Sequence, residues 1–103
     1  MEMADEKRRR KSRERSSGAA LAARAREELS EITGLQAESV TALEPEDDGT
    51  WVITVELLEL SRIPETDDML GSYEVQVDED GEILGYRRVR RYARSQADHG
   101  APA

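Results

Sequence analysis

Apolar residues follow two different spacings along the chain, and the change falls near Gly34. Before it, four apolar residues recur at steps of four, four and three, as on one face of a helix: Leu21, Ala25, Leu29 and Ile32. Gly34 predicts the end of this helix, because glycine readily takes the left-handed conformation that often follows a last helical turn. Ser16 or Ser17 is a candidate cap for its start, although no Glu or Gln completes a capping box.

Beyond Gly34 the apolar spacing falls to two, which is typical of strands. Four runs show it, at residues 40–44, 51–60, 73–77 and 83–92. Pro45 follows the first run and places it at a sheet edge, because proline has no N–H to give to a ladder. The alternation changes phase at Leu57 and Leu58, which predicts a bulge there, and the last run loses its regularity near Val89.

Two acidic segments that contain glycine join these runs and predict tight turns, at residues 47–49 and 78–81. If Asp80 and Gly81 form a two-residue turn, Glu74 faces Arg87 across the last two strands. A four-residue turn would place Gly85 opposite Glu74 instead. We favour the first register, because facing opposite charges contribute about 0.2–1 kcal/mol.

These elements predict one α+β domain, in which an N-terminal helix packs on an antiparallel β-meander of three to four strands. We assign this domain to residues 18–94. Residues 1–17 are charged and almost free of apolar side chains, so we expect a disordered or frayed basic tail. We expect residues 95–103 to form a flexible C-terminal tail.

Length and composition narrow the possible function classes. A chain of 103 residues forms one domain with a thin core, so we do not expect a deep, enclosed active site. Cysteine is absent, which excludes disulfides and thiolate metal sites. There is no apolar run long enough to span a membrane and no secretory apolar segment. We therefore expect a soluble, cytoplasmic protein.

Charge is divided unevenly along the chain, although the net charge is −8. Residues 1–17 sum to +3, residues 27–82 sum to −17, and the five arginines between residues 87 and 94 add +5. Such a separation bears on partners and long-range fields rather than on the fold.

The residue types that usually carry chemistry form no recognisable site. Placing Gly81 at the sixth position of a calcium loop puts Arg87 at the twelfth, where a Glu is required. His99 stands alone in a tail rich in small residues, and no nucleotide-binding or nucleophile motif occurs. We expect no catalytic residue, no cofactor, no metal and no small-molecule substrate, and hence no enzyme.

The basic end of the last strand is the strongest candidate for binding a partner. Its residues interleave aromatic and positive side chains: Tyr86, Arg87, Arg88, Arg90, Arg91, Tyr92 and Arg94. The arginines could pair with acidic neighbours and protect a sheet edge, or they could dock a protein. A third interpretation is a small nucleic-acid-binding regulator that also uses the basic tail, although the acidic body would repel phosphates. Apolar residues on the sheet face away from the helix, such as Val52 and Leu58, are a second candidate docking surface.

Several short segments carry a family resemblance: VELLE at 55–59, RIP at 62–64, DDML at 67–70, YEV at 73–75, DG at 80–81 and YRRVRRY at 86–92. On these segments, residues 52–95 resemble the gas vesicle protein O family. The preceding helix and its exit at Gly34 also fit, so the resemblance covers about residues 19–95. Residues 1–17 match nothing specific in the family.

The resemblance implies an accessory protein of gas vesicle formation, acting as an assembly factor or adaptor that binds other gas vesicle proteins. It implies no catalysis and supplies no functional residues. Shell subunits that face gas must be apolar and prone to aggregate before assembly, and a small acidic domain could hold them in solution. The implied location is the cytoplasm, with association with the vesicle left open. An inhibitory module of the kind that accompanies secreted enzymes is a further alternative, disfavoured by the missing signal segment.

Overall fold

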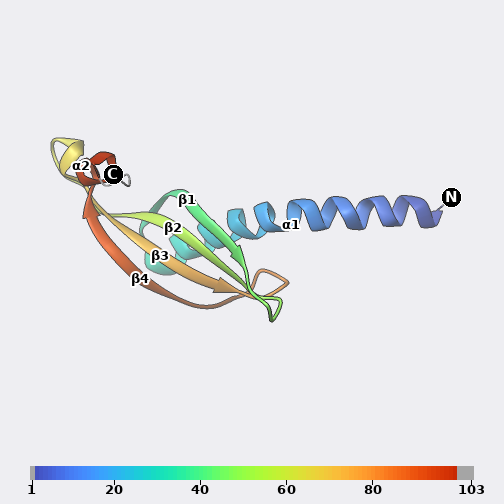
Figure 1. Ribbon diagram of the computed structural model, residues 1–103. Helices are drawn as coiled ribbons and strands as arrows, with labels where there is room; N and C mark the ends of the chain where they lie inside the picture. Colours follow the sequence, from blue (N-terminus) through green and yellow to red (C-terminus); the bar gives the residue numbers. More distant parts are fainter. Residues whose placement is uncertain (1, 100–103) are drawn as a thin grey trace.

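The computed structural model describes the backbone of residues 2–99 and the side chains of residues 18–96. Its elements follow in this order: α1 (Glu2–Thr33), β1 (Gln36–Pro45), β2 (Trp51–Leu60), the 3-10 turn η1 (Glu65–Asp67), β3 (Met69–Val77), β4 (Ile83–Ala93) and α2 (Arg94–His99). The strands form one antiparallel sheet in the order β1-β2-β3-β4, with α1 against one face (Figure 1). The predicted α+β fold is confirmed, with four strands in the meander.

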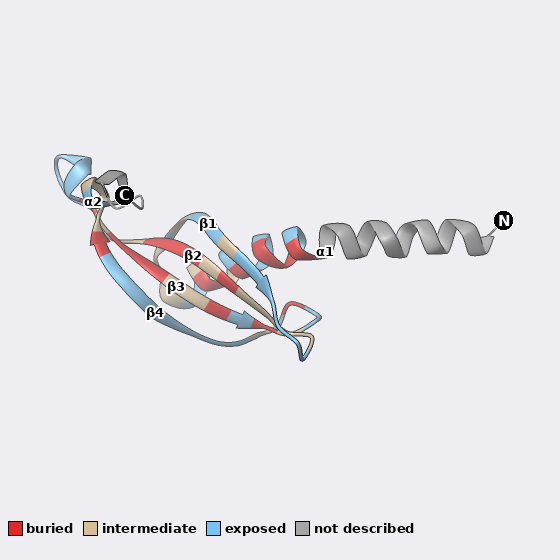
Figure 2. Ribbon diagram, viewed as in Figure 1, coloured by how far each residue is buried: buried red, intermediate tan, exposed pale blue. Residues whose placement is uncertain are grey.

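The hydrophobic core lies between α1 and the sheet. Leu21, Ala25 and Leu29 are buried, as predicted. They pack against alternate residues of β2 and β3 that face the helix: Ile53, Val55, Leu57, Val75 and Val77. Figure 2 shows this layer as the buried segments of α1, β2 and β3. Each fully buried Leu or Val contributes roughly 1.5–3 kcal/mol, so this layer fixes α1 on the sheet.

The prediction that Ile32 shares the buried face is wrong, since Ile32 is 54% exposed. It stands in the last turn of α1, at the end of the row Arg24–Glu28–Ile32, in which side chains four residues apart lie above one another. Helix α1 packs mainly on β1 and less on β2 and β3. The sheet side chains therefore do not enclose the end of this row.

Both ends of α1 can be compared with the sequence. Gly34 has a φ of 72°, and its N–H donates to the carbonyl of Ser30 at 2.9 Å, which confirms the predicted C-terminal end. The predicted start at Ser16 or Ser17 is wrong, because α1 begins at Glu2 and extends beyond the sheet (Figure 1). At the other end of the chain, Arg94–His99 form α2. Residues 100–103 of the expected C-terminal tail lie outside the described residues.

The predicted register of β3 and β4 is confirmed, but the turn that produces it is different. Glu74 faces Arg87. The turn spans residues 78–82, with Gly81 at a φ of 88° donating to the carbonyl of Asp78 at 3.0 Å. A register shift then leaves Leu84 as an extra residue in β4. This bulge, not a two-residue turn at residues 80 and 81, restores the pairing of Glu74 with Arg87.

Other register shifts insert single residues into three strands. The shift near Val89 agrees with the irregularity predicted there. The bulge predicted at Leu57 and Leu58 falls slightly later, between Leu58 and Leu60, with Glu59 as the extra residue. Strand β1 has two further shifts, which leave Glu38 and Thr41 as the extra residues. Bulges re-aim side chains, and these three polar residues all enter the networks described below.

The sheet has two free edges. Strand β1, which ends at Pro45, lies at one edge as predicted, and β4 forms the other. No helix in the described part of the chain is long and apolar enough to cross a membrane.

Candidate functional site

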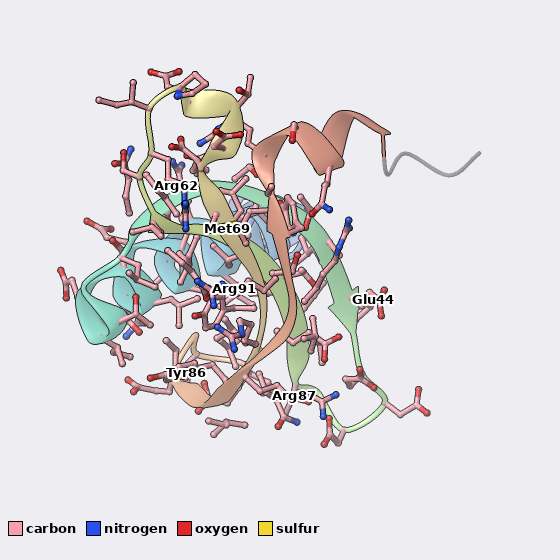
Figure 3. All side chains as sticks on the ribbon, turned by 90° about the vertical axis from the view of Figure 1, so that its left-hand side faces the viewer. Glu44, Arg62, Met69, Tyr86, Arg87 and Arg91 are labelled. Carbon is pink, nitrogen blue, oxygen red and sulfur yellow. The ribbon has the colours of Figure 1, made fainter. Side chains whose placement is uncertain are left out.

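Strand β4 carries five exposed residues of the predicted docking set, which we call the arginine edge: Tyr86, Arg87, Arg88, Arg90 and Arg91. Their side chains leave the strand on both faces of the sheet. Figure 3 shows Arg87 on one side of β4, with Tyr86 and Arg91 on the other. Because β4 is an outer strand, the backbone groups along its free side face no neighbouring strand among the described residues.

Arg87 projects from the face away from α1. Its Nη2 donates to Glu74 Oε1 at 3.0 Å, across the register predicted from the sequence. The Arg87 side chain is 78% exposed. An exposed pair of this kind contributes at most about 1 kcal/mol, so the arginine is held in place weakly and stays accessible.

On the helix side of the sheet, Glu59 gathers two arginines and a tyrosine. Arg88 Nη1 lies 3.1 Å and Arg91 Nε 3.2 Å from Glu59 Oε1, and the Tyr73 hydroxyl donates to Oε2 at 2.5 Å. The Glu59 side chain is 9% exposed. Burial, and then the neighbouring Glu59 carboxylate, raise the pKa of Tyr73. Two arginines around one carboxylate leave this cluster with a positive balance.

Arg90 differs from its neighbours. Its guanidinium stacks over the Tyr92 ring, 4.5 Å from the ring centroid. Among the described side chains, no carboxylate lies within ion-pair distance of Arg90. It is therefore the arginine of the edge with the most charge available to a partner.

Tyr92 belongs to a buried network rather than to the exposed edge. It is 8% exposed and donates its hydroxyl proton to Glu56 Oε1 at 2.7 Å. Glu56, itself 7% exposed, also accepts from the hydroxyls of Ser72 and Thr41, the latter at 2.8 Å. Burial and this carboxylate raise the pKa of Tyr92 to about 12. The network ties β1, β3 and β4 to β2 on the face away from α1.

Arg94 is likewise engaged within the fold. Its guanidinium reaches both oxygens of Glu38, at 2.6 and 2.8 Å, and Asp68 Oδ2 at 3.1 Å. Asp68 also accepts from the backbone N–H of Arg62 at 2.7 Å, and these contacts lower the pKa of Asp68. The hydrogen bonds from Arg94 lower the pKa of Glu38. Arg94 thus joins β1, the loop before β3 and the end of β4.

The sequence did not indicate the carboxylates that organise these networks. Glu56 and Glu59 interrupt an otherwise apolar run, and that interruption is the only local signal for them. Glu38 and Thr41 reach their partners because bulges in β1 re-aim them. Of the seven residues proposed for docking, the structure brings five together on the exposed edge and places Tyr92 and Arg94 in internal networks.

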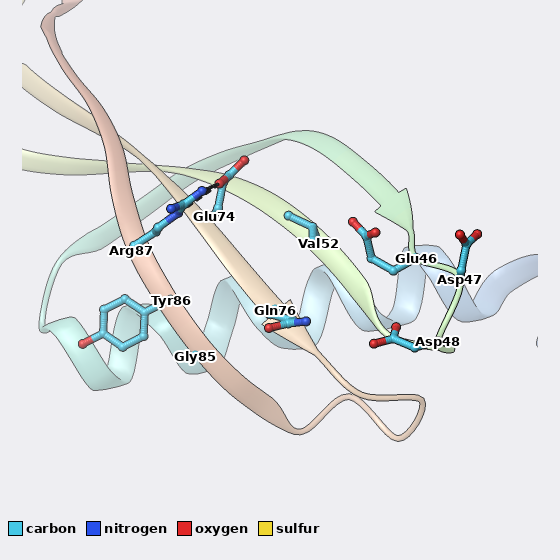
Figure 4. Close-up of a pocket in the computed structure, with 9 residues that line it drawn as sticks. All are labelled: Glu46, Asp47, Asp48, Val52, Glu74, Gln76, Gly85, Tyr86 and Arg87. Atoms are coloured by element: carbon cyan, nitrogen blue, oxygen red, sulfur yellow. Dashed lines mark hydrogen bonds and ion pairs between the residues drawn. The ribbon is translucent and has the colours of Figure 1, made fainter.

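An open depression of about 600 Å³ lies on the face away from α1. Figure 4 shows its lining residues: Glu46, Asp47, Asp48, Val52, Glu74, Gln76, Gly85, Tyr86 and Arg87. Val52, from the second candidate surface, is one of these lining residues, most of which are polar or charged. Hydrogen bonds from Thr50 lower the pKa of Asp48, which suits a solvated turn rather than an acid catalyst. Among the described residues, no three metal-ligating side chains gather in one place.

Comparison with known proteins gives consistent matches. Residues 4–98 match the model of a family described as gas vesicle synthesis protein GvpO. A Streptomyces protein, gas vesicle protein O, is 54% identical over 71 residues, which are 69% of this chain and 55% of that protein. Gas vesicle protein O of Haloferax mediterranei is 35% identical and gas vesicle protein O1 of Halobacterium salinarum 37% identical, again over 69% of this chain, and over 51% and 59% of those proteins. The chain thus spans about half the length of these relatives. No solved structure matches it.

Proposed function

Because the chain belongs to the GvpO family of gas vesicle synthesis proteins, we propose that it acts in gas vesicle formation as a non-catalytic assembly factor or adaptor. In this role it binds other gas vesicle proteins, either the shell subunit or accessory proteins. Its place of action is the cytoplasm, at the growing vesicle. The observation that carries the proposal is the arginine edge on the free side of the sheet.

The arginine edge suits a partner segment that carries acidic side chains. Arginines project on both faces of β4, so a second copy of this strand placed alongside would set positive charge against positive charge. An acidic segment meets no such repulsion, and the free backbone groups of β4 can accept it as an added strand. Arg90 and the 78% exposed Arg87 offer the most accessible charge.

The same geometry weighs against nucleic acid as the partner. Arg87, Arg88 and Arg91 already contact carboxylates. A phosphate would have to displace those carboxylates within a strongly acidic body, and phosphate contacts dominate nucleic-acid affinity. We expect no retardation of single- or double-stranded DNA in a gel shift at low salt.

The proposal is tested by charge reversal that leaves the Glu59 cluster intact. In a gas-vesicle-forming host that lacks its own copy of the gene, wild type is compared with the double variant Arg87→Glu/Arg90→Glu. The control, Arg26→Glu/Arg62→Glu, changes the net charge equally at exposed positions away from β4. Thermal unfolding establishes that both variants are folded.

We expect vesicles, counted by electron microscopy, with wild type and the control but at least tenfold fewer with the β4 variant. Normal vesicle numbers with a folded β4 variant would show that the arginine edge is not the docking surface. Normal vesicles in the strain without the gene would refute the role in vesicle formation itself.

A further inference from the structure

Helix α1 covers only part of the sheet face on which it lies. Neighbouring strands are about 4.8 Å apart and a helix with its side chains is about 10 Å across, so one helix covers about two strands. Helix α1 contacts β1 most, and β2 and β3 less. On the side of β4 that faces α1, Ile83 packs at the border of the core, whereas Tyr86, Arg88 and Arg91 are exposed, so a strip along β4, bordered by the half-buried Tyr73 of β3, stays open.

This open strip carries aromatic and charged side chains rather than a fully polar surface. Tyr73 packs against the edge of the core, and its ring centroid lies 6.4 Å from that of Tyr86. Tyr86 is 45% exposed. Beside them stand Arg88 and Arg91, which share the carboxylate of Glu59.

The side of α1 toward the strip contributes one apolar residue. Arg24 Nη1 donates to the carbonyl of Asp80 at 2.8 Å, which shows that this side of α1 faces the β3–β4 turn. Glu28 and Ile32 continue the same row along the helix. Ile32, 54% exposed, is the apolar side chain that α1 leaves uncovered between this row and its buried stripe.

We propose that an amphipathic α-helix of a partner protein docks on this strip, beside α1 and along β3 and β4. Its apolar stripe contacts Tyr73, Tyr86 and Ile32. An acidic side chain on its flank meets Arg88 and Arg91, because their two positive charges exceed the single negative charge of Glu59. The partner is a different protein rather than a second copy. Leu21 and Leu29, two of the three large apolar side chains on the described part of α1, are already buried in its own core. Ile32 stands alone among outer positions that otherwise carry small, polar and charged residues, so α1 of a second copy offers no further apolar stripe.

The proposal rests on the proposed function, since it names the kind of partner element that the adaptor would hold. It is tested by incorporating a photo-crosslinking amino acid at Ile32, at Tyr86 or, as a control, at the fully exposed Ile63. Crosslinking is done in vesicle-forming cells, and the crosslinked peptides are mapped by mass spectrometry.

We expect Ile32 and Tyr86 to crosslink to one segment of one other gas vesicle protein, at positions spaced by three, four or seven residues. Ile63 should not reach that segment. Three results would overturn the proposal. They are crosslinks that join only two copies of this chain, crosslinked partner positions spaced by two as in a strand, and the absence of any crosslink from both sites.

A matched pair of substitutions separates this inference from the proposed function. Ile32→Asp is expected to lower vesicle numbers at least tenfold, and Ile63→Asp to leave them unchanged. The second test variant, Tyr86→Asp, should behave like Ile32→Asp. If both test variants are folded and form normal vesicles while Arg87→Glu/Arg90→Glu does not, the docked helix is refuted and the adaptor role stands.

Discussion

Removing one hydroxyl, with Tyr92→Phe, tests whether the Glu56 network holds β4 in place. The Tyr92 hydroxyl donates to Glu56 at 2.7 Å, and both residues are less than a tenth exposed. A hydrogen bond to a charged group contributes about 1.5–3 kcal/mol. Water does little to replace it here, so we expect a loss of about 2 kcal/mol in the free energy of unfolding. That is a large share of the roughly 5–15 kcal/mol that stabilises a typical domain.

The assay is urea unfolding followed by the fluorescence of Trp51, the single tryptophan, which packs at the border of the core. The matched control is Tyr86→Phe. The Tyr86 hydroxyl is on the exposed edge, so its removal should lower the free energy of unfolding by less than about 0.5 kcal/mol. In a Glu56→Gln background, where the acceptor is neutral, the cost of Tyr92→Phe should fall to about 1 kcal/mol. Equal costs for Tyr92→Phe and Tyr86→Phe would refute the reasoning.

Three further predictions concern the same core and networks. The pKa of Tyr92 is about 12 in the folded state and about 10 in the unfolded state. Because the unfolded state loses this proton first as the pH rises, the free energy of unfolding should fall by roughly 2–3 kcal/mol between pH 10 and pH 12, and Tyr92 should cause no loss below pH 10. Denaturant titrations across that window should show the loss in wild type, and a Tyr92→Phe variant that loses as much would contradict it. Leu29→Ala removes a fully buried side chain and should cost about 2–5 kcal/mol in urea unfolding; a cost under 1 kcal/mol is inconsistent with the described packing. Arg94→Met leaves Asp68 and Glu38 without their shared cation and should lower the free energy of unfolding by about 2 kcal/mol. Unchanged thermal stability would mean that these ion pairs do not stabilise the fold.

The regular parts of the fold could be predicted because their signals are local. The alternation from Trp51 to Leu57 and the helical spacing from Leu21 to Leu29 each follow from one buried face. Gly34 marks its helix end through its own backbone preference. These features can be predicted without knowing which strand or helix packs against each segment.

The features that the sequence could not specify depend on the opposing strand or on the extent of the sheet. Ile32 has the right spacing for burial, but the helix covers only part of the sheet, and Ile32 stays exposed. The bulges that aim Glu38 and Thr41 arise from how β1 pairs with β2. The arginine edge could be recognised from its composition, whereas the burial of Tyr92 depends on a carboxylate thirty-six positions away.

Co-purification at graded salt tests the docking role of β4 most directly. Tagged wild type, Arg87→Glu/Arg90→Glu and the control Arg26→Glu/Arg62→Glu are each isolated from vesicle-forming cells, and the retained gas vesicle proteins are quantified by mass spectrometry. We predict that wild type and the control retain at least one other gas vesicle protein at low salt, that retention falls as salt rises because the contact is between charges, and that the β4 variant loses it at every salt concentration. Equal retention by a folded β4 variant would contradict the account.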